Sequence, residues 1–152
     1  MFKSKSCIAI ASIAAGLISL VGVASALTVD QPVTPAFVKE NAKRISVEAK
    51  KQVDGLIHFT ITYNPPQPTY LVATTEIRSG DKILFQSTST AFVREKSVTY
   101  YAAIAPERVA EAKFELFAGF FAESDGNPTP LPGGIAYQIQ LSEFAKTAGE
   151  VK

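Results

Sequence analysis

The stretch that decides the fold is Lys113–Ala122, Lys-Phe-Glu-Leu-Phe-Ala-Gly-Phe-Phe-Ala, which holds four of the ten phenylalanines. Successive residues of a β-strand face opposite sides, so alternate residues share a face. One face of this stretch carries Phe114, Leu116, Ala118, Phe120 and Ala122, and the other carries Glu115, Phe117, Gly119 and Phe121. A strand that is apolar on much of both faces is usually central or covered. We therefore predict that Lys113–Ala122 is the central strand of an all-β sandwich.

The N-terminus has the pattern of a secretory signal. Lys3 and Lys5 supply positive charge, residues 8–23 form an uncharged apolar run, and Ala24-Ser25-Ala26 is a small-x-small cleavage site. We expect residues 1–26 to be removed, which leaves no transmembrane span. The sequence predicts bacterial export, to the periplasm or outside the cell. The only cysteine, Cys7, lies before the apolar run and would be lost with the signal.

The composition of the expected mature chain excludes several classes of protein. Cleavage after Ala26 leaves 126 of the 152 residues, which suits one domain with a real core. Without the two signal lysines, 13 basic residues face 14 acidic ones, and no basic stripe is present. We therefore expect no nucleic-acid partner. A mature chain without cysteine has no thiol nucleophile and no zinc–thiolate site.

Turn signals around the central stretch divide the chain into strands. Asp54-Gly55, the prolines of residues 64–68 and Ser79-Gly80-Asp81 each end an alternating segment. We expect seven strands: Lys43–Val53, Leu56–Tyr63, Thr69–Arg78, Lys82–Thr88, Ser97–Ile104, Lys113–Ala122 and Ile135–Leu141.

The segments outside these strands complete the expected organisation. The sandwich domain covers residues 43–141, and a leader at residues 27–42 either lies against it, pairs at an edge or is a flexible spacer. Residues 123–134 are expected to form a long loop rich in glycine and proline. The tail at residues 142–152 is expected to start a short helix capped by Ser142.

The order of hairpins and crossings resembles the immunoglobulin and fibronectin type III topology over roughly Lys43–Leu141. The resemblance implies an antiparallel sandwich of about seven strands. Two features of true immunoglobulin domains are missing from the mature sequence, the inter-sheet cysteine pair and the tryptophan of the third strand. A jelly roll or a small open barrel also fits the pattern.

The residues give little support to catalysis, and we predict that the chain is not an enzyme. His58 is the only histidine, and the alternation of its strand turns it outward. No nucleophile-elbow motif accompanies it. One histidine cannot alone build a copper or zinc site, so we expect no metal and no cofactor.

The expected loop offers a weaker candidate site. Glu123, Asp125 and Asn127 place oxygen donors at alternate positions, as calcium loops do, but no acidic residue follows where such a loop needs one. Exposed tyrosines such as Tyr70 and Tyr101 are possible sugar platforms. A small-ligand carrier for a carbohydrate or divalent cation, using residues 123–134, is therefore the alternative function.

The stronger signal is the apolar excess of the central strand. If one face fills the core, Phe117 and Phe121 point outward, where an apolar patch marks an interface. The competing interpretation is that Phe37 or Phe144 covers them. The leading hypothesis is an exported, non-catalytic binding or envelope-structural module. Its partner would be a protein, another envelope component or a second copy. The expected binding residues are Phe117, Phe121, Asp125 and Asn127.

Overall fold

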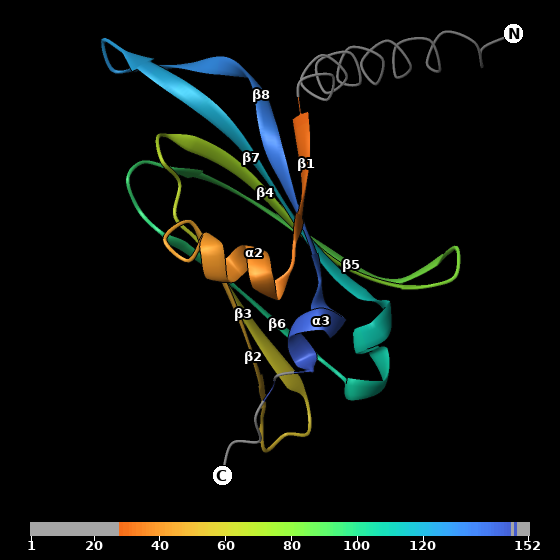
Figure 1. Ribbon diagram of the computed structural model, residues 1–152. Helices are drawn as coiled ribbons and strands as arrows, with labels where there is room; N and C mark the ends of the chain where they lie inside the picture. Colours follow the sequence, from red (N-terminus) through yellow and green to blue (C-terminus); the bar gives the residue numbers. More distant parts are fainter. Residues whose placement is uncertain (1–27, 147, 149–152) are drawn as a thin grey trace, which may run out of the picture.

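The computed structural model describes residues 28–146 and 148, and in this part of the chain it forms two β-sheets (Figure 1). The predicted signal peptide lies outside the described residues. The strands are β1 (Thr28–Val33), β2 (Ile45–Lys51), β3 (Ile57–Tyr63), β4 (Thr69–Ser79), β5 (Lys82–Val93), β6 (Val98–Ile104), β7 (Ala112–Ser124) and β8 (Asn127–Gln140). The arrangement is consistent with an all-β sandwich, as the sequence predicts.

The central position of β7 is confirmed. The five-stranded sheet has the order β1-β8-β7-β4-β5, and the three-stranded sheet has the order β2-β3-β6. All neighbours pair antiparallel except β1, which runs parallel to β8. The part of the leader at Thr28–Val33 is therefore an edge strand.

Three short helical segments lie at the ends of the strands. Helix α2 (Pro35–Glu40) joins β1 to β2 and is capped by the Thr34 hydroxyl, which accepts a hydrogen bond from the Phe37 N–H. The 3₁₀ helix η1 (Pro106–Glu111) leads into β7, and α3 (Leu141–Ala145) follows β8. The predicted cap at Ser142 is wrong, because α3 begins one residue earlier and has no side-chain cap.

The core lies between the two sheets and is built from the inward residues that the alternation predicts. From β3 come Phe59, Ile61 and Tyr63, and from β7 come Phe114 and Leu116, all buried. Burial of these side chains is the main force that holds the sheets together, because neither sheet can remove its own apolar face from water.

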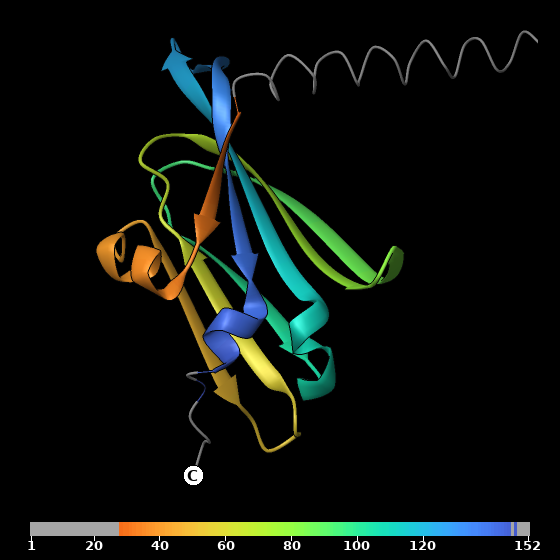
Figure 2. The same cartoon turned by 45° about the vertical axis from the view of Figure 1, so that its right-hand side comes forward.

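Two strand ends differ from the prediction. The segment predicted as a long loop, residues 123–134, instead extends the β7–β8 hairpin, and only Asp125 and Gly126 form its turn. Both turn residues have a positive φ, 52° and 78°, as tight hairpin turns require. Likewise β5 continues to Val93, five residues beyond the expected end at Thr88. The two long hairpins, β4–β5 and β7–β8, extend to opposite sides of the molecule in Figures 1 and 2.

Candidate functional site

An aromatic surface lies on the face of the five-stranded sheet that points away from the core. Phe117 and Phe121 of β7 lie on it, as predicted. The register adds Val72, opposite Phe117, and Tyr70, which pairs with both Gly119 and Phe92. We call the five large side chains on this surface the outer aromatic face: Tyr70, Val72, Phe92, Phe117 and Phe121.

Two glycines shape the middle of the outer aromatic face. Gly119 of β7 and Gly134 of β8 are direct register partners, and the Phe117 ring lies over both. A Cβ atom placed on Gly134 would lie 2.8 Å from Phe117 Cε2. Because no side chain stands at either glycine, the ring of Phe117 can lie flat on the sheet, which leaves it half-buried.

A pair of aromatic rings and an ion pair lie at one end of this face. The rings of Phe92 and Phe121 meet edge to face, with 5.2 Å between centroids. The Arg94 guanidinium stands 5.0 Å from the centroid of Phe92 and forms an ion pair with Glu123. Aromatic rings bordered by an arginine are typical of the centres of protein interfaces.

The two segments proposed to cover Phe117 and Phe121 lie elsewhere. Phe37 packs against the core, with its ring 6.4 Å from that of Tyr137. Phe144 is itself buried in the core. Neither ring lies on the outer aromatic face, where Phe92 remains 40% exposed.

The other half of the same surface is polar. Glu76 of β4 is only 5% exposed, and its carboxylate accepts hydrogen bonds from Arg78 and faces Lys113 Nζ at 3.3 Å. The hydrogen bonds from Arg78, together with Lys113, lower the pKa of Glu76 despite its burial. This cluster keeps a charged carboxylate on the sheet and divides the surface into an aromatic and an ionic half.

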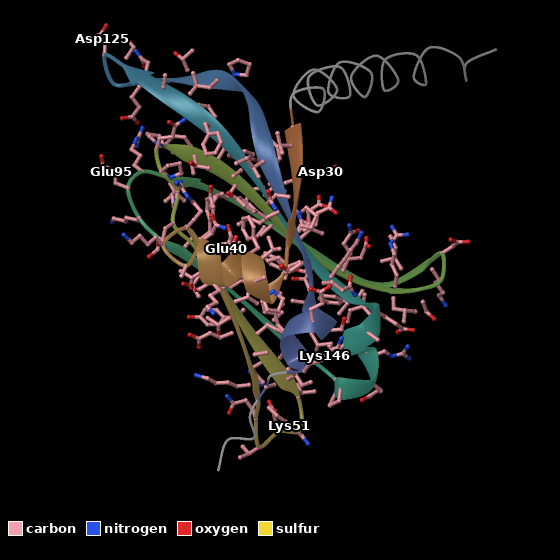
Figure 3. All side chains as sticks on the ribbon, viewed as in Figure 1. Asp30, Glu40, Lys51, Glu95, Asp125 and Lys146 are labelled. Atoms are coloured by element: carbon pink, nitrogen blue, oxygen red, sulfur yellow. The ribbon has the colours of Figure 1, made fainter. Side chains whose placement is uncertain are left out.

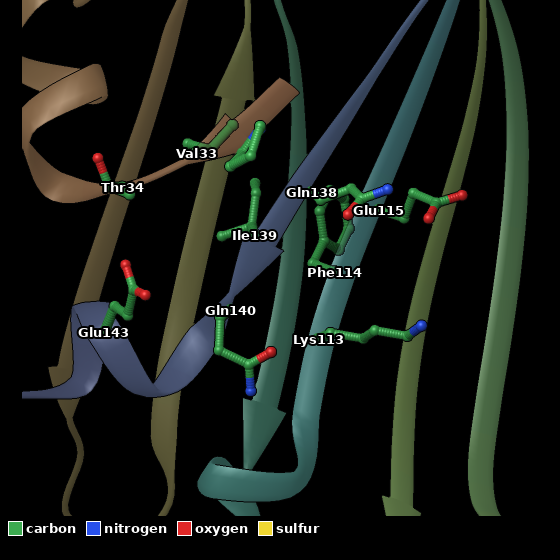
Figure 4. Close-up of a pocket in the computed structure, with 10 residues that line it drawn as sticks. Val33, Thr34, Lys113, Phe114, Glu115, Gln138, Ile139, Gln140 and Glu143 are labelled. Atoms are coloured by element: carbon green, nitrogen blue, oxygen red, sulfur yellow. The ribbon is translucent and has the colours of Figure 1, made fainter. Parts of the chain in front are cut away.

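A pocket of about 250 Å³ lies beside this ionic half, between the end of β1 and strands β7 and β8. In Figure 4 the Lys113 and Glu115 side chains extend toward β4, whereas Glu143 stands on α3 at the other side. The Gln140 amide donates to the backbone oxygens of Ala110 and Ala112. Because Gln140 and Lys113 both have partners within the chain, much of the polar lining is already engaged.

The other predicted binding residues, Asp125 and Asn127, lie at the tip of the β7–β8 hairpin (Figure 3). The register pairs Ser124 with Asn127 and Glu123 with Pro128, so Glu123 and Asn127 face opposite sides of the ribbon. The proposed calcium donors therefore do not converge. Among residues 28–146 and 148, no group of three histidine, cysteine or acidic side chains is placed to hold a metal ion.

The single histidine is on the outside of the other sheet, as predicted. His58 Nε2 lies 2.7 Å from Asp54 Oδ2 in the turn before β3. A hydrogen bond from the Leu56 N–H, and then the one from His58, lower the pKa of Asp54. The pair thus stabilises the β2–β3 turn.

The sequence interpretation missed Phe92 as part of the site. The expected strand ends at Thr88, because the run of serine and threonine at residues 87–90 carries no apolar alternation. If the alternation of inward and outward residues is continued from Phe85 to Val93, Val93 faces inward and Phe92 faces outward. The structure has this arrangement, since Val93 is buried and Phe92 pairs with the outward-facing Tyr70.

The comparisons with known proteins give no family. No family model matches the sequence, and no curated protein matches it. In the part of the chain that is described, no helix is long and apolar enough to cross a membrane. The function must therefore be argued from the surfaces themselves.

Proposed function

We propose that this chain is an exported, non-catalytic, immunoglobulin-like module that binds a protein or another envelope component through its outer aromatic face. The observation that carries this proposal is the gathering of four aromatic rings and Val72 on one sheet surface, with the rings of Phe92 and Phe121 in contact, where neither Phe37 nor Phe144 covers them. Apolar patches of this kind on a sheet surface mark sites of association.

The immunoglobulin-like description is supported by the order of the strands. β2, β3 and β6 stand where strands A, B and E of a fibronectin type III domain stand, and β5, β4, β7 and β8 follow the order C′, C, F and G. The parallel pairing of β1 with β8 adds an edge strand to that scheme.

Export is supported by the N-terminal charge pattern, the apolar run and the small residues at 24–26. Removal of residues 1–26 would leave all eight described strands intact, because β1 begins at Thr28. The absence of cysteine from the expected mature chain suits a domain whose stability rests on packing alone.

The alternative, a small-ligand carrier using residues 123–134, has less support. The hairpin there is a two-stranded ribbon with a two-residue turn, and its oxygen donors diverge. Tyr137, the tyrosine of β8, is buried in the core and cannot serve as a sugar platform.

The experiment that tests binding is chemical crosslinking in the native cell envelope, followed by identification of the captured species. The informative variant is Phe92→Ser with Phe121→Ser, because these rings are less constrained than Phe117, which packs on two glycines. Tyr101→Ser is the matched control, since Tyr101 is 78% exposed on the other sheet.

We expect one dominant partner to be captured by the wild type and by the control, and to be lost from the double variant. Equal capture by all three proteins, or no capture by a folded wild type, would overturn the proposal. N-terminal sequencing of the exported protein tests the signal separately. A chain that begins at Leu27 supports export, and a chain retained in the cytoplasm with Met1 contradicts it.

A further inference from the structure

The free edges of the two sheets are not equally protected. A strand at a sheet edge exposes unpaired N–H and C=O groups, and proteins block such edges with charges and prolines. β1 carries Asp30 and Pro32, and β2 carries Glu48, Lys50 and Lys51. β1 pairs with β8 from Gly134 to Ile139, so the part of β8 before Gly134 lacks this partner. That part carries Pro128, Pro130 and Pro132.

β5 has none of these protections. Its residues Ile83–Val93 contain no charge and no proline over eleven positions, and within the described part of the chain strand β4 is its only sheet partner. The three-stranded sheet covers the inward side of β5 at Val93 but not at Phe85, which is 50% exposed although it faces the core side. Ile83 and Leu84 are exposed as well. This edge is therefore long, uncharged and apolar at both ends.

We propose that β5 is a self-association edge, on which β5 of a second copy pairs antiparallel around a two-fold axis at Thr88. Such pairing would join the two five-stranded sheets into one sheet of ten strands. The proposal concerns the backbone edge of β5, which shares Phe92 with the outer aromatic face. Its test at Thr88 does not depend on the capture of another partner.

The pattern of side chains along β5 favours a second copy of β5 as the partner strand, and it favours the register centred on Thr88. With Thr88 opposite Thr88, Leu84 meets Phe92 on the outward side, and Phe85 meets Ala91 on the inward side. Ser87 then meets Ser89, so apolar residues face apolar ones and polar residues face polar ones. Cross-strand pairs of this kind are the unit of sheet stabilisation.

The neighbouring registers are less favourable. Moving the axis to Ser87 places Lys82 opposite Phe92 and Phe85 opposite Ser89, and moving it to Ser89 places Gln86 opposite Phe92. In the proposed register the charged residues Lys82 and Arg94 meet only at the two ends, where Arg94 is already paired with Glu123. A second copy in this register therefore matches the apolar and the uncharged polar positions of Ile83–Val93, and the one like-charge contact lies at the ends of the paired segment.

The test is disulfide trapping, because a residue on a two-fold axis meets its own copy. The full 152-residue chain is produced with Cys7→Ser, so that each introduced cysteine is the only one. Thr88→Cys is the diagnostic variant and Gln86→Cys the matched control on the same face of β5. In the proposed register the two copies of residue 86 are four residues apart along the strands, about 13 Å.

Mild oxidation of the purified protein is expected to give a covalent dimer with Thr88→Cys and little with Gln86→Cys. Tyr101→Cys tests the competing uncharged edge, β6, which borders a groove of about 340 Å³ together with Phe85. A dimer that forms best through Tyr101, one that forms equally at all positions, or none at Thr88 in a folded protein would overturn the proposal.

A second variant checks that trapping reports on strand pairing and not on random collision. Ser87→Lys with Ser89→Lys places lysines directly opposite each other in the proposed register, and like charges at such positions are destabilising. Added to Thr88→Cys, these changes should abolish the dimer. A dimer that persists would contradict β5 pairing.

Discussion

At the scale of single residues, Gly134 has less room for a side chain than the other glycine of the outer aromatic face, Gly119. A Cβ atom on Gly134 would lie 2.7 Å from the Ala118 carbonyl oxygen and 2.8 Å from the Phe117 ring. The carbonyl belongs to the neighbouring strand and cannot rotate away, so overpacking must move the backbone. We expect Gly134→Ala to lower the free energy of unfolding by about 1–3 kcal/mol, measured by urea denaturation.

Gly119→Ala is the internal control for that prediction. Its nearest contact would be Phe117 Cε1 at 3.2 Å, a side-chain atom that can shift by a few tenths of an ångström. We expect a smaller loss than at Gly134. Equal losses at the two positions would show that the ring contact, and not the carbonyl, limits the space.

The Glu76 cluster leads to a pH-dependent prediction. The pKa of Glu76 is lowered from 4.5, first by the hydrogen bonds from Arg78 and then by Lys113. A carboxylate with a lowered pKa in the folded state stabilises the fold above its ordinary pKa and loses that contribution as the pH falls through the folded value. We expect Glu76→Gln to be less stable than the wild type at pH 7. The difference should shrink as the pH falls below about 4.5, measured as urea midpoints across this range.

Glu115→Gln serves as the control for this prediction. Glu115 faces the same side of β7 as Lys113, the residue that pairs with Glu76. Within the described part of the chain, Glu115 itself makes no ion pair. Its variant should follow the wild-type pH curve. A constant difference between Glu76→Gln and the wild type down to pH 3 would contradict the role of the charge.

At the scale of elements, the turn of the β7–β8 hairpin depends on backbone geometry alone. A Cβ atom on Gly126 would meet nothing within 4 Å, yet its φ of 78° disfavours any other residue. Gly126→Ala should therefore destabilise the turn by about 1 kcal/mol, and the effect should be confined to the β7–β8 hairpin. We expect faster amide hydrogen exchange in residues 121–130, seen by NMR, with an unchanged core.

Asp125→Asn is the contrasting change at the same turn, since asparagine tolerates the φ of 52° found there. Exchange in the hairpin should stay at the wild-type rate. If Asp125→Asn loosened the hairpin as much as Gly126→Ala, the carboxylate and not the backbone would hold the turn.

The elements show how far the sequence could predict this fold and where it failed. The inward residues of β3, β4, β6 and β7 follow from the period of two, because a sandwich core selects apolar side chains at every second position. The extensions of β5 and β8 could not be seen in this way. Exposed hairpins need no apolar face, so Ser87–Thr90 and the prolines of residues 128–132 read as loop.

The candidate site was predicted only in part, for a related reason. The outward direction of Phe117 and Phe121 follows from the alternation of β7, but their neighbours depend on which strands flank β7 and in what register. A single sequence does not specify that register, so Phe92 was missed. Asp125 was placed in a binding loop because its role in a two-residue turn depends on the strands around it.

At the scale of the whole molecule, the unequal widths of the two sheets explain the exposure of the β5 edge. Three strands cannot cover five, and β5 is therefore left with two exposed sides. The outer aromatic face and the β5 edge adjoin at Phe92, which belongs to both. If β5 pairs with a second copy, the aromatic faces of the two copies lie on the same side of one continuous sheet.

The same division into two sheets predicts how the protein unfolds. Ile61 of β3 and Ile139 of β8 lie in different sheets, and both are almost fully buried in the shared core. Because the inner faces of both sheets share one core, we expect a single unfolding transition. Ile61→Val and Ile139→Val should each lower the free energy of unfolding by about 0.5–1.5 kcal/mol. Circular dichroism and tyrosine fluorescence should give coincident curves for both variants. The opposite result would be that Ile61→Val shifts only one of the two unfolding curves and Ile139→Val only the other. The two sheets would then unfold separately. In that case the five-stranded sheet would be stable without the core that it shares with the three-stranded sheet.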